Sequence, residues 1–284
     1  MTSFCIKINN KEIIDYLLNN CKDINLGNII LSNKVFRFYE NTIIHYTGND
    51  VSSFYNSLAD VIANCIIKFY EHDIIKKLIN TNYFYFSSHE RKQIFNNTLE
   101  QIQLDDDLIS RKKHNLYISV LKYIVENKSM ILDGFVNFRI FNYIKNLDYV
   151  VDLGVNKFLI EREYTEFISL LRLYINSKEP GINSIHLIYT DSQSILIDND
   201  KNIISIEDNI FNAKYLSDIT FSSNDYALNT LLSIIPEKII IHLVDEPDEF
   251  INTLNLIFEN RIIICTDCSI CETYRIKNNK KILH

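Results

Sequence analysis

The first fifty residues alternate apolar and polar side chains in short runs that turn residues separate. Phe4 to Ile8 alternates with the period of two that is typical of a strand, whereas Glu12 to Cys21 repeats its apolar side chains at helical spacing. Further strand-like runs lie at Asn28–Leu31, Val35–Tyr39 and Thr42–Tyr46. The pattern predicts a small α/β unit over residues 1–48.

Apolar residues recur at helical spacing through most of residues 49–180. Asp50 or Ser52 is suited to cap a helix whose apolar stripe runs from Phe54 to Phe69. Further helices are predicted over Ser88–Leu104, Arg111–Asn127 and Phe135–Ile175, with the last one broken near Asn146. Pro180 and Gly181 then end the helical pattern. This part of the chain is therefore predicted to be a central helical bundle.

The period of the pattern returns to two beyond Gly181. Ser184–Tyr189 and Ser194–Ile197 predict a β-hairpin. Lys238–Leu243, Asp248–Phe258 and Arg261–Cys265 predict a strand, a helix and a strand, and such a crossover joins parallel strands in a right-handed sense. Residues 181–284 are therefore predicted to be a C-terminal α/β subdomain, and the chain as a whole is assigned to the α+β class.

Composition favours a globular protein. Of the 284 residues, 47% are hydrophobic and 23% are charged, which is enough apolar material for one large or two small cores. No stretch approaches the roughly 18 uncharged apolar residues that a membrane span needs, and the N-terminus lacks the order of a secretion signal. Six cysteines are too few for a disulfide scaffold of this size. We therefore expect a cytoplasmic protein without a membrane span.

The net charge of the chain indicates which classes of binding partner to expect. The formal charge of -7 provides no basic field that would neutralise a phosphate backbone, so no nucleic-acid partner is expected. A local basic run at Arg111, Lys112 and Lys113 is expected to form the solvated first turn of a helix.

The motifs of common enzyme sites are missing. The five glycines occur singly, so there is no phosphate-binding loop, and neither a His-Glu-x-x-His helix nor a Gly-x-Ser-x-Gly elbow is present. His186 lies in a strand-like run and is expected to be an ordinary hydrogen-bonded or solvated imidazole. The sequence therefore favours a protein that is not an enzyme.

Several stretches in the second half of the chain carry a family resemblance by their joint occurrence and order. They are Gly134-Phe-Val-Asn-Phe-Arg139, Tyr143, Glu163-Tyr-Thr-Glu-Phe167, Leu170-Leu-Arg172, Ile239-Ile-Ile-His242, Phe258–Arg261 and Cys265-Thr-Asp-Cys268-Ser-Ile-Cys271. In these stretches the chain resembles the YtxC-like family, which is associated with sporulation in endospore-forming Firmicutes. The resemblance implies a non-enzymatic interaction module with a protein partner in spore development. It brings no established biochemical activity with it.

Arg139, Tyr143 and Glu163 form the polar part of this resemblance. They can be read as architecture, in which Arg139 pairs with Glu163 or Glu166 beside an apolar helix face. They can also be read as a polar cluster in a pocket, which would be the site of an enzyme of unrecognised type. Ion-pair networks are more often architectural, which favours the first interpretation.

Cys265, Cys268 and Cys271 have the spacing of a metal site. A thiolate at every third residue allows one turn of chain to direct several sulfurs to one centre. A bacterial ferredoxin site is excluded because no further Cys followed by Pro comes after Cys271. Zinc is the candidate cofactor, since three thiolates and one imidazole would complete a tetrahedral site.

A fourth ligand is suggested by the two C-terminal strands. Lys238–His242 and Arg261–Cys265 share one layout, so adjacent parallel strands in register would place His242 and Cys265 together at the carboxyl edge of the sheet. His284 is a competing candidate.

Two other interpretations of the three cysteines stay open. In the first, the cysteines are small buried hydrophobic residues. In the second, they include a disulfide or redox pair. Asp267 and Glu272 are expected to raise the pKa of the thiols, which argues against a reactive nucleophile.

Overall fold

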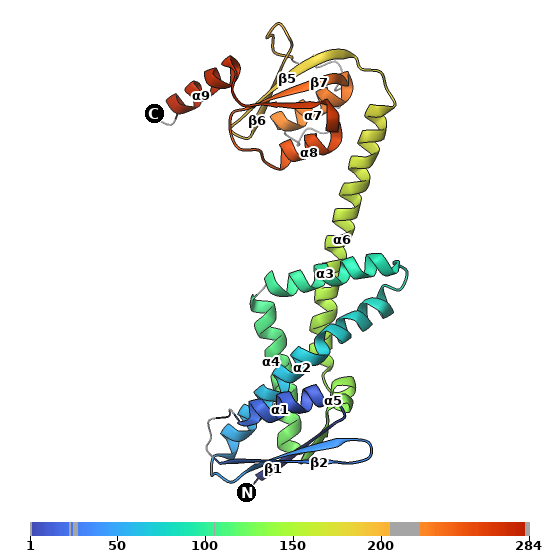
Figure 1. The fold of residues 1–284 in the computed structure, drawn as a ribbon, viewed down its shortest axis with the longest axis vertical. Helices are drawn as coiled ribbons and strands as arrows, with labels where there is room; N and C mark the ends of the chain where they lie inside the picture. Colours follow the sequence, from blue (N-terminus) through green and yellow to red (C-terminus); the bar gives the residue numbers. More distant parts are fainter. Residues whose placement is uncertain (1, 23, 25–27, 105, 205–221, 282–284) are drawn as a thin grey trace, which may run out of the picture. The chain divides into compact units, whose positions relative to one another are not determined.

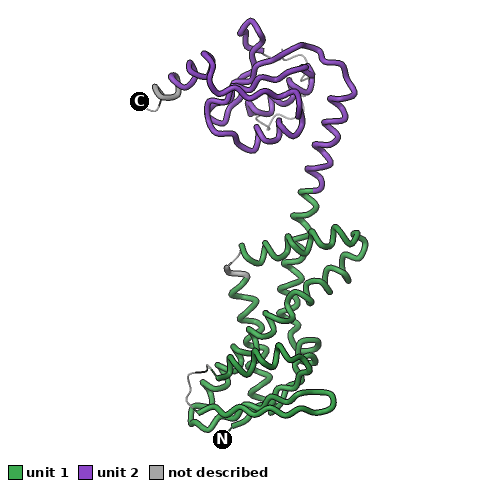
Figure 2. Tube along the Cα trace, in the orientation of Figure 1, with its two compact units in different colours: residues 1–161 green, residues 162–284 purple. Residues whose placement is uncertain are grey.

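The computed structural model describes residues 2–22, 24, 28–104, 106–204 and 222–281. Contacts divide the chain into two compact units, Met1–Glu161 and Arg162–His284 (Figure 2). Each unit contains its own four-stranded sheet and its own hydrophobic core (Figure 1). The predicted α+β class is therefore confirmed. Among the described residues, no helix combines the length and the apolar composition that crossing a membrane requires.

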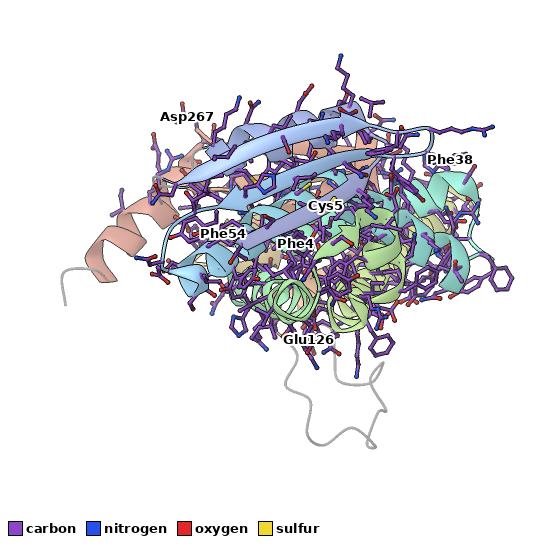
Figure 3. The ribbon with its side chains drawn as sticks, turned by 90° about the horizontal axis from the view of Figure 1, so that it is seen from below. Phe4, Cys5, Phe38, Phe54, Glu126 and Asp267 are labelled. Atoms are coloured by element: carbon purple, nitrogen blue, oxygen red, sulfur yellow. The ribbon has the colours of Figure 1, made fainter. Side chains whose placement is uncertain are left out.

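The sheet of the first unit consists of β1 (Thr2–Ile8), β2 (Ile29–Val35), β3 (Glu40–Tyr46) and β4 (Ser129–Ile131), in the order β2-β3-β1-β4. β3 pairs antiparallel with both β1 and β2, whereas β4 is parallel to β1. In β1 the side chains of Phe4, Ile6 and Ile8 are buried and those between them are half-buried, as strand alternation requires. Figure 3 shows this sheet in front of its helices.

One predicted strand of this unit is wrong. The run Val35–Tyr39 was predicted as a separate strand, but β2 extends to Val35 and residues 36–39 form the tip of the β2–β3 hairpin. The backbone N–H of Phe36 donates to the carbonyl of Tyr39, which closes the turn. Aromatic residues favour strands, but here the chain reversal takes precedence over that propensity.

The helices predicted for the first unit are present. They are α1 (Lys11–Lys22), α2 (Val51–Asn82), α3 (Ser88–Leu104), α4 (Asp106–Glu126), α5 (Leu132–Phe138) and the first part of α6 (Phe141–Asn176). However, α2 continues to Asn82, beyond the predicted stripe that ends at Phe69, and α4 begins at Asp106, before Arg111. Asp50 caps α2, because its side chain accepts from the backbone N–H of Ser53. The predicted break near Asn146 is wrong: the helical region is interrupted at Arg139, which caps α5, and Asn146 lies inside α6.

A buried polar network joins three helices of the first unit. The ammonium of Lys112 (α4) donates to both carboxylate oxygens of Glu71 (α2), at 2.8 and 2.7 Å. Tyr143 of α6 is fully buried and donates its hydroxyl to the same carboxylate. Lys112 is only 5% exposed, so the expectation of a solvated helix turn at Arg111–Lys113 is wrong for this residue. The ammonium is tolerated in the core because it is paired and hydrogen-bonded.

The sheet of the second unit consists of β5 (Ile182–Thr190), β6 (Gln193–Ile197), β7 (Pro236–Leu243) and β8 (Ile262–Cys265), in the order β6-β5-β7-β8. β5 and β6 form the predicted antiparallel hairpin, and β7 is parallel to both β5 and β8. The helices are the end of α6, α7 (Ser223–Ile234), α8 (Glu249–Phe258), a single 3-10 turn (Glu259–Arg261) and α9 (Ser269–Lys281). Neither α7 nor α9 was predicted.

The core of the second unit lies on one face of this sheet. Ile185, Leu187, Ile239 and Ile241 point to that face and pack with side chains of α6, α7 and α8, which are Ile168, Ile175, Ala227, Leu231, Ile251 and Leu254. The next residues along β5 and β7 point to the opposite face, because side chains alternate along a strand. His186 and His242 are therefore on the face that these three helices do not cover.

The predicted division into residues 1–48, 49–180 and 181–284 stays a prediction about domains. The contacts place the limit between the two units inside α6, since the last turns of this helix carry Ile168 and Ile175 into the second core. The hydrophobic period changes at Gly181 because α6 has ended shortly before it. The boundary between the two units lies earlier, at residues 161–162 inside α6.

The Glu71–Lys112 pair can be tested by removing one partner. We expect Glu71→Gln to destabilise the protein by about 3–5 kcal/mol, because the ammonium of Lys112 would stay buried without its counter-ion. Lys113→Ala is the matched control: its ammonium pairs with Asp60 at 3.2 Å, but both side chains are about half exposed, so the loss should be below about 1 kcal/mol. Urea unfolding measures both. Equal losses would contradict the role assigned to the buried pair.

Candidate metal centre

The candidate centre is built at the carboxyl ends of two neighbouring strands. β7 and β8 run parallel, and His242 is the register partner of Cys265. Paired positions in a sheet present their side chains to the same face, so an imidazole and a thiol lie side by side there. The pairing that the shared layout of the two strands predicts is confirmed.

The other two thiols come from the start of α9. Cys268 directly precedes the first helical residue, and Cys271 lies in the first turn. Residues three apart on a helix share a face, so both sulfurs are directed to the same side. The four residues together enclose a small space: the ligand atoms of His242, Cys265, Cys268 and Cys271 all lie within 4.8 Å of one another.

The distances agree with a tetrahedral metal. Nδ1 of His242 lies 3.2 Å from Sγ of Cys268 and 3.6 Å from Sγ of Cys271, and these two sulfurs are 3.7 Å apart. A tetrahedral zinc ion with Zn–S bonds of about 2.3 Å and a Zn–N bond of about 2.0 Å separates two sulfurs by about 3.8 Å and a sulfur from a nitrogen by about 3.5 Å. The residues therefore fit zinc without rearrangement of these three ligands.

Protonation of the imidazole also suits a ligand. His242 is 3% exposed. Burial, with the neighbouring His186 as a second cause, lowers the pKa of His242 below its usual value. The folded protein therefore favours the neutral imidazole, which has the free lone pair that a metal needs.

The two thiols of α9 differ in their pKa. Burial raises the pKa of Cys268, but hydrogen bonds from the backbone of Cys271 and Ile270 and from neighbouring thiols outweigh it, so the pKa lies below that of an ordinary thiol. Burial and then the neighbouring sulfurs raise the pKa of Cys271 to about 11. The expectation of a raised pKa beside Asp267 and Glu272 is therefore wrong for Cys268, because the N–H groups at the start of α9 stabilise its thiolate.

His186 is a fifth residue at this centre. Its Nδ1 lies 2.9 Å from Nε2 of His242, on the side of that ring away from the sulfurs, and the two rings are nearly parallel with centres 5.1 Å apart. The expectation that His186 is an ordinary imidazole does not include this place beside the cluster. A signal was present in the alternation of β5, which places His186 on the same face as His242 once the two strands are known to be neighbours.

The other predicted cluster is not assembled. Tyr143 is buried and bonds to Glu71, whereas Arg139 and Glu163 are both exposed. Glu163 lies twenty positions further along α6, in the second unit. Arg139, Tyr143 and Glu163 are therefore not brought together within either unit. His284, the competing fourth ligand, lies outside the described residues.

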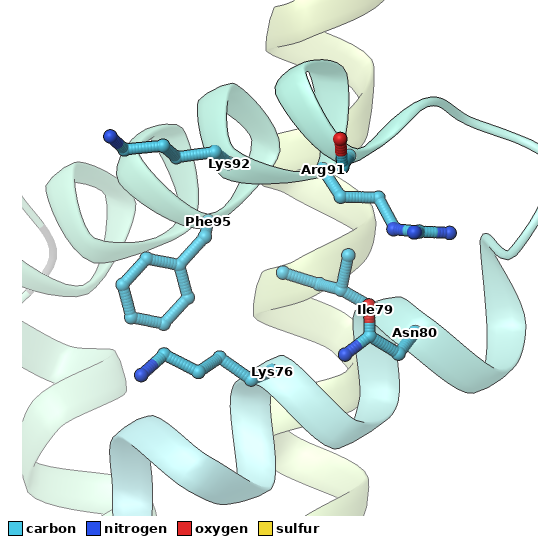
Figure 4. Close-up of a pocket in the computed structure, with 7 residues that line it drawn as sticks. Lys76, Ile79, Asn80, Arg91, Lys92 and Phe95 are labelled. Atoms are coloured by element: carbon cyan, nitrogen blue, oxygen red, sulfur yellow. The ribbon is translucent and has the colours of Figure 1, made fainter.

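A pocket between α2 and α3 collects basic side chains but contains none of the predicted site residues. Its volume is about 240 Å³, and Lys76, Arg91, Lys92 and Phe95 contribute to its walls (Figure 4). The ammonium of Lys76 lies 5.5 Å from the centre of the Phe95 ring and 3.9 Å from the carboxylate of Asp73. The guanidinium of Arg91 donates to the carbonyl of Phe84. Two of its three cations thus have partners outside the pocket.

Comparison with known proteins identifies similar sequences. The sequence model of the YtxC-like family matches residues 56–263. The matched segment contains His242 and ends just before Cys265. The protein named "Uncharacterized protein YtxC" of Bacillus subtilis (strain 168) is 22% identical over 219 residues, which cover 69% of this chain and 73% of that protein. No solved structure matches.

The difference between the thiols predicts an order of alkylation. In the metal-free protein at neutral pH, we expect iodoacetamide to modify Cys268 first, because a lowered pKa gives it the larger thiolate fraction. Cys21 and Cys65 should be modified last, since both are fully buried and burial raises their pKa to about 12. Peptide mapping by mass spectrometry at successive times measures the order. Modification of Cys21 as fast as Cys268 would contradict it.

Proposed function

Because the chain belongs to the YtxC-like family, and the Bacillus subtilis protein that it matches is named only as uncharacterized, we propose a function from the geometry of this chain: it is a zinc-binding protein. The ion is held by His242, Cys265, Cys268 and Cys271. The observation that carries the proposal is the convergence of these four ligand atoms to within 4.8 Å of one another, from two strands and one helix.

The donor set favours zinc and a structural role. Three thiolates and one imidazole are soft to borderline ligands, which suit zinc and do not suit magnesium or calcium. Four protein ligands fill a tetrahedral shell and leave no position for a substrate or a catalytic water. This closed shell supports a non-enzymatic protein.

The ion would attach α9 to the sheet. Among residues 269–276, the part of α9 whose side chains are described, Cys271 is the only one that is buried. Ile276, an apolar side chain of this helix, is 58% exposed. Since α9 contributes so little apolar surface to a core, the metal bonds to Cys268 and Cys271 supply the attachment, and metal binding is coupled to folding of this segment.

The zinc content of the purified protein tests the proposal. We expect one zinc ion per chain by plasma mass spectrometry, and loss of most of it in Cys268→Ser, because a hydroxyl does not replace a thiolate on zinc. Cys5→Ser is the matched control, since Cys5 lies in β1 of the first unit, outside the cluster. Wild-type protein without zinc, or zinc that is unchanged in Cys268→Ser, would refute the proposal.

Removal of the metal gives a second readout. A chelator should speed tryptic cleavage after Arg275 in α9, because the helix loses its attachment to the sheet. The wild-type protein should regain protection when zinc is restored, and Cys268→Ser should be cleaved rapidly with or without zinc.

A second candidate function is an interaction module in sporulation. Its support is the family resemblance, together with exposed apolar side chains on the second-unit part of α6: Phe167, Leu170 and Leu173 are 55%, 64% and 67% exposed. Exposed apolar side chains at this spacing, on one side of a helix, are typical of protein-binding surfaces. In this proposal the chain acts in the cytoplasm on a protein partner and has no activity of its own.

Genetics in a spore-forming host tests this second candidate. We expect deletion of the gene to reduce the number of heat-resistant spores, and complementation by wild type but not by the double variant Leu170→Asp, Leu173→Asp to restore it. Ser169→Asp is the control, because Ser169 is an exposed polar position of the same helix. Unchanged spore numbers after deletion, or full rescue by the double variant, would refute the role.

A further inference from the structure

We infer that His186 is a positioning residue of the zinc site, which accepts a hydrogen bond from Nε2–H of His242 and so directs Nδ1 of His242 to the metal. This inference rests on the proposed zinc site, and it assigns to a residue outside the four ligands a part in binding the ion.

The strand register brings the two imidazoles together. In the parallel pair β5–β7, His186 is opposite Ile240 and His242 is opposite Ile188, so the two histidines are diagonal neighbours on one face of the sheet. Nδ1 of His186 lies 2.9 Å from Nε2 of His242, which is the ordinary length of an N–H to N hydrogen bond.

The two nitrogens of His242 have separate tasks. Nδ1 is the atom that lies 3.2 and 3.6 Å from the sulfurs of Cys268 and Cys271, so Nδ1 is the ligand atom. A neutral imidazole carries one N–H, and a ligand nitrogen must be without it, so the proton of His242 is on Nε2. The nearest acceptor for this N–H is Nδ1 of His186, which must then carry its own proton on Nε2.

The hydrogen bond matters because His242 is almost completely buried. At 3% exposure, an N–H without a partner would cost free energy, and the alternative tautomer would remove the lone pair from the metal side. Ligand histidines ordinarily donate their second N–H to a carboxylate or a carbonyl, and such partners fix both the tautomer and the orientation of the ring. In this protein an imidazole takes that place.

Two substitutions separate hydrogen bonding from packing. His186→Leu keeps much of the volume and removes the acceptor, whereas His186→Asn offers an amide oxygen near the position of Nδ1. We expect His186→Leu to bind zinc about 10- to 100-fold more weakly than wild type, the range for loss of such a partner, and His186→Asn to bind within a few-fold of wild type. Ser184→Ala is the control, because Ser184 lies on the same strand and face and its hydroxyl donates to Asn199.

The measurements are competition for zinc with a chromophoric chelator and the ¹⁵N spectrum of the histidines in the zinc-loaded protein. The spectrum should show His242 protonated at Nε2 in wild type, which is a feature that packing alone would not fix. Thermal unfolding of each variant reports whether it is folded, and His186→Asn keeps the test valid if His186→Leu does not fold.

The outcomes distinguish this inference from the proposed function. Wild-type protein that binds no zinc would refute the zinc site and this inference with it. Wild-type protein that binds zinc, with His186→Leu binding it equally well, would refute the role of His186 alone. His186→Asn binding as weakly as a folded His186→Leu would also overturn the role as acceptor.

Discussion

The in-register, parallel pairing of β7 with β8 is the constraint on which the metal centre depends. It places His242 opposite Cys265, and a slip by one residue would turn one of the two side chains to the other face of the sheet. The remaining ligands, Cys268 and Cys271, come from a single turn of chain directly after β8. The centre therefore requires one long-range alignment, to which Ile239 and Ile241 of β7 and the partly buried Ile262 of β8 contribute by packing in the core of the second unit.

The parts of this centre that could be predicted are those that the local pattern specifies. The segments Lys238–His242 and Arg261–Cys265 have the same layout, so aligning them shows the register directly, although β7 has eight residues and β8 only four. His186 could not be assigned in the same way, since its position relative to His242 depends on which strand lies next to β7. α9 could not be predicted because it has too few apolar residues to form an apolar stripe at helical spacing. It contacts the rest of the unit at the cluster of His242 and the three cysteines instead.

In the first unit, the predictions made from the sequence are wrong where tertiary packing overrides the local sequence pattern. Lys112 stands in a basic run, and only the packing of α4 against α2 and α6 shows that its ammonium meets Glu71 inside the core. Asn146 is a weak helix former, but its neighbours Leu147, Val150 and Val151 are buried and hold that part of α6 in the helix. Residue propensities describe isolated segments, whereas these positions are determined by partners that are distant in sequence.

α6 contributes to both hydrophobic cores of the chain. Tyr143 to Phe158 supply buried side chains to the first core, and Ile168 and Ile175 supply them to the second. The two halves of the gene can therefore not be exchanged independently of each other at codon 181, where the sequence pattern changes. A recombination event at codon 181 would deliver a C-terminal half whose sheet lacks part of its apolar cover, so natural selection is expected to keep the two halves together as one heritable unit.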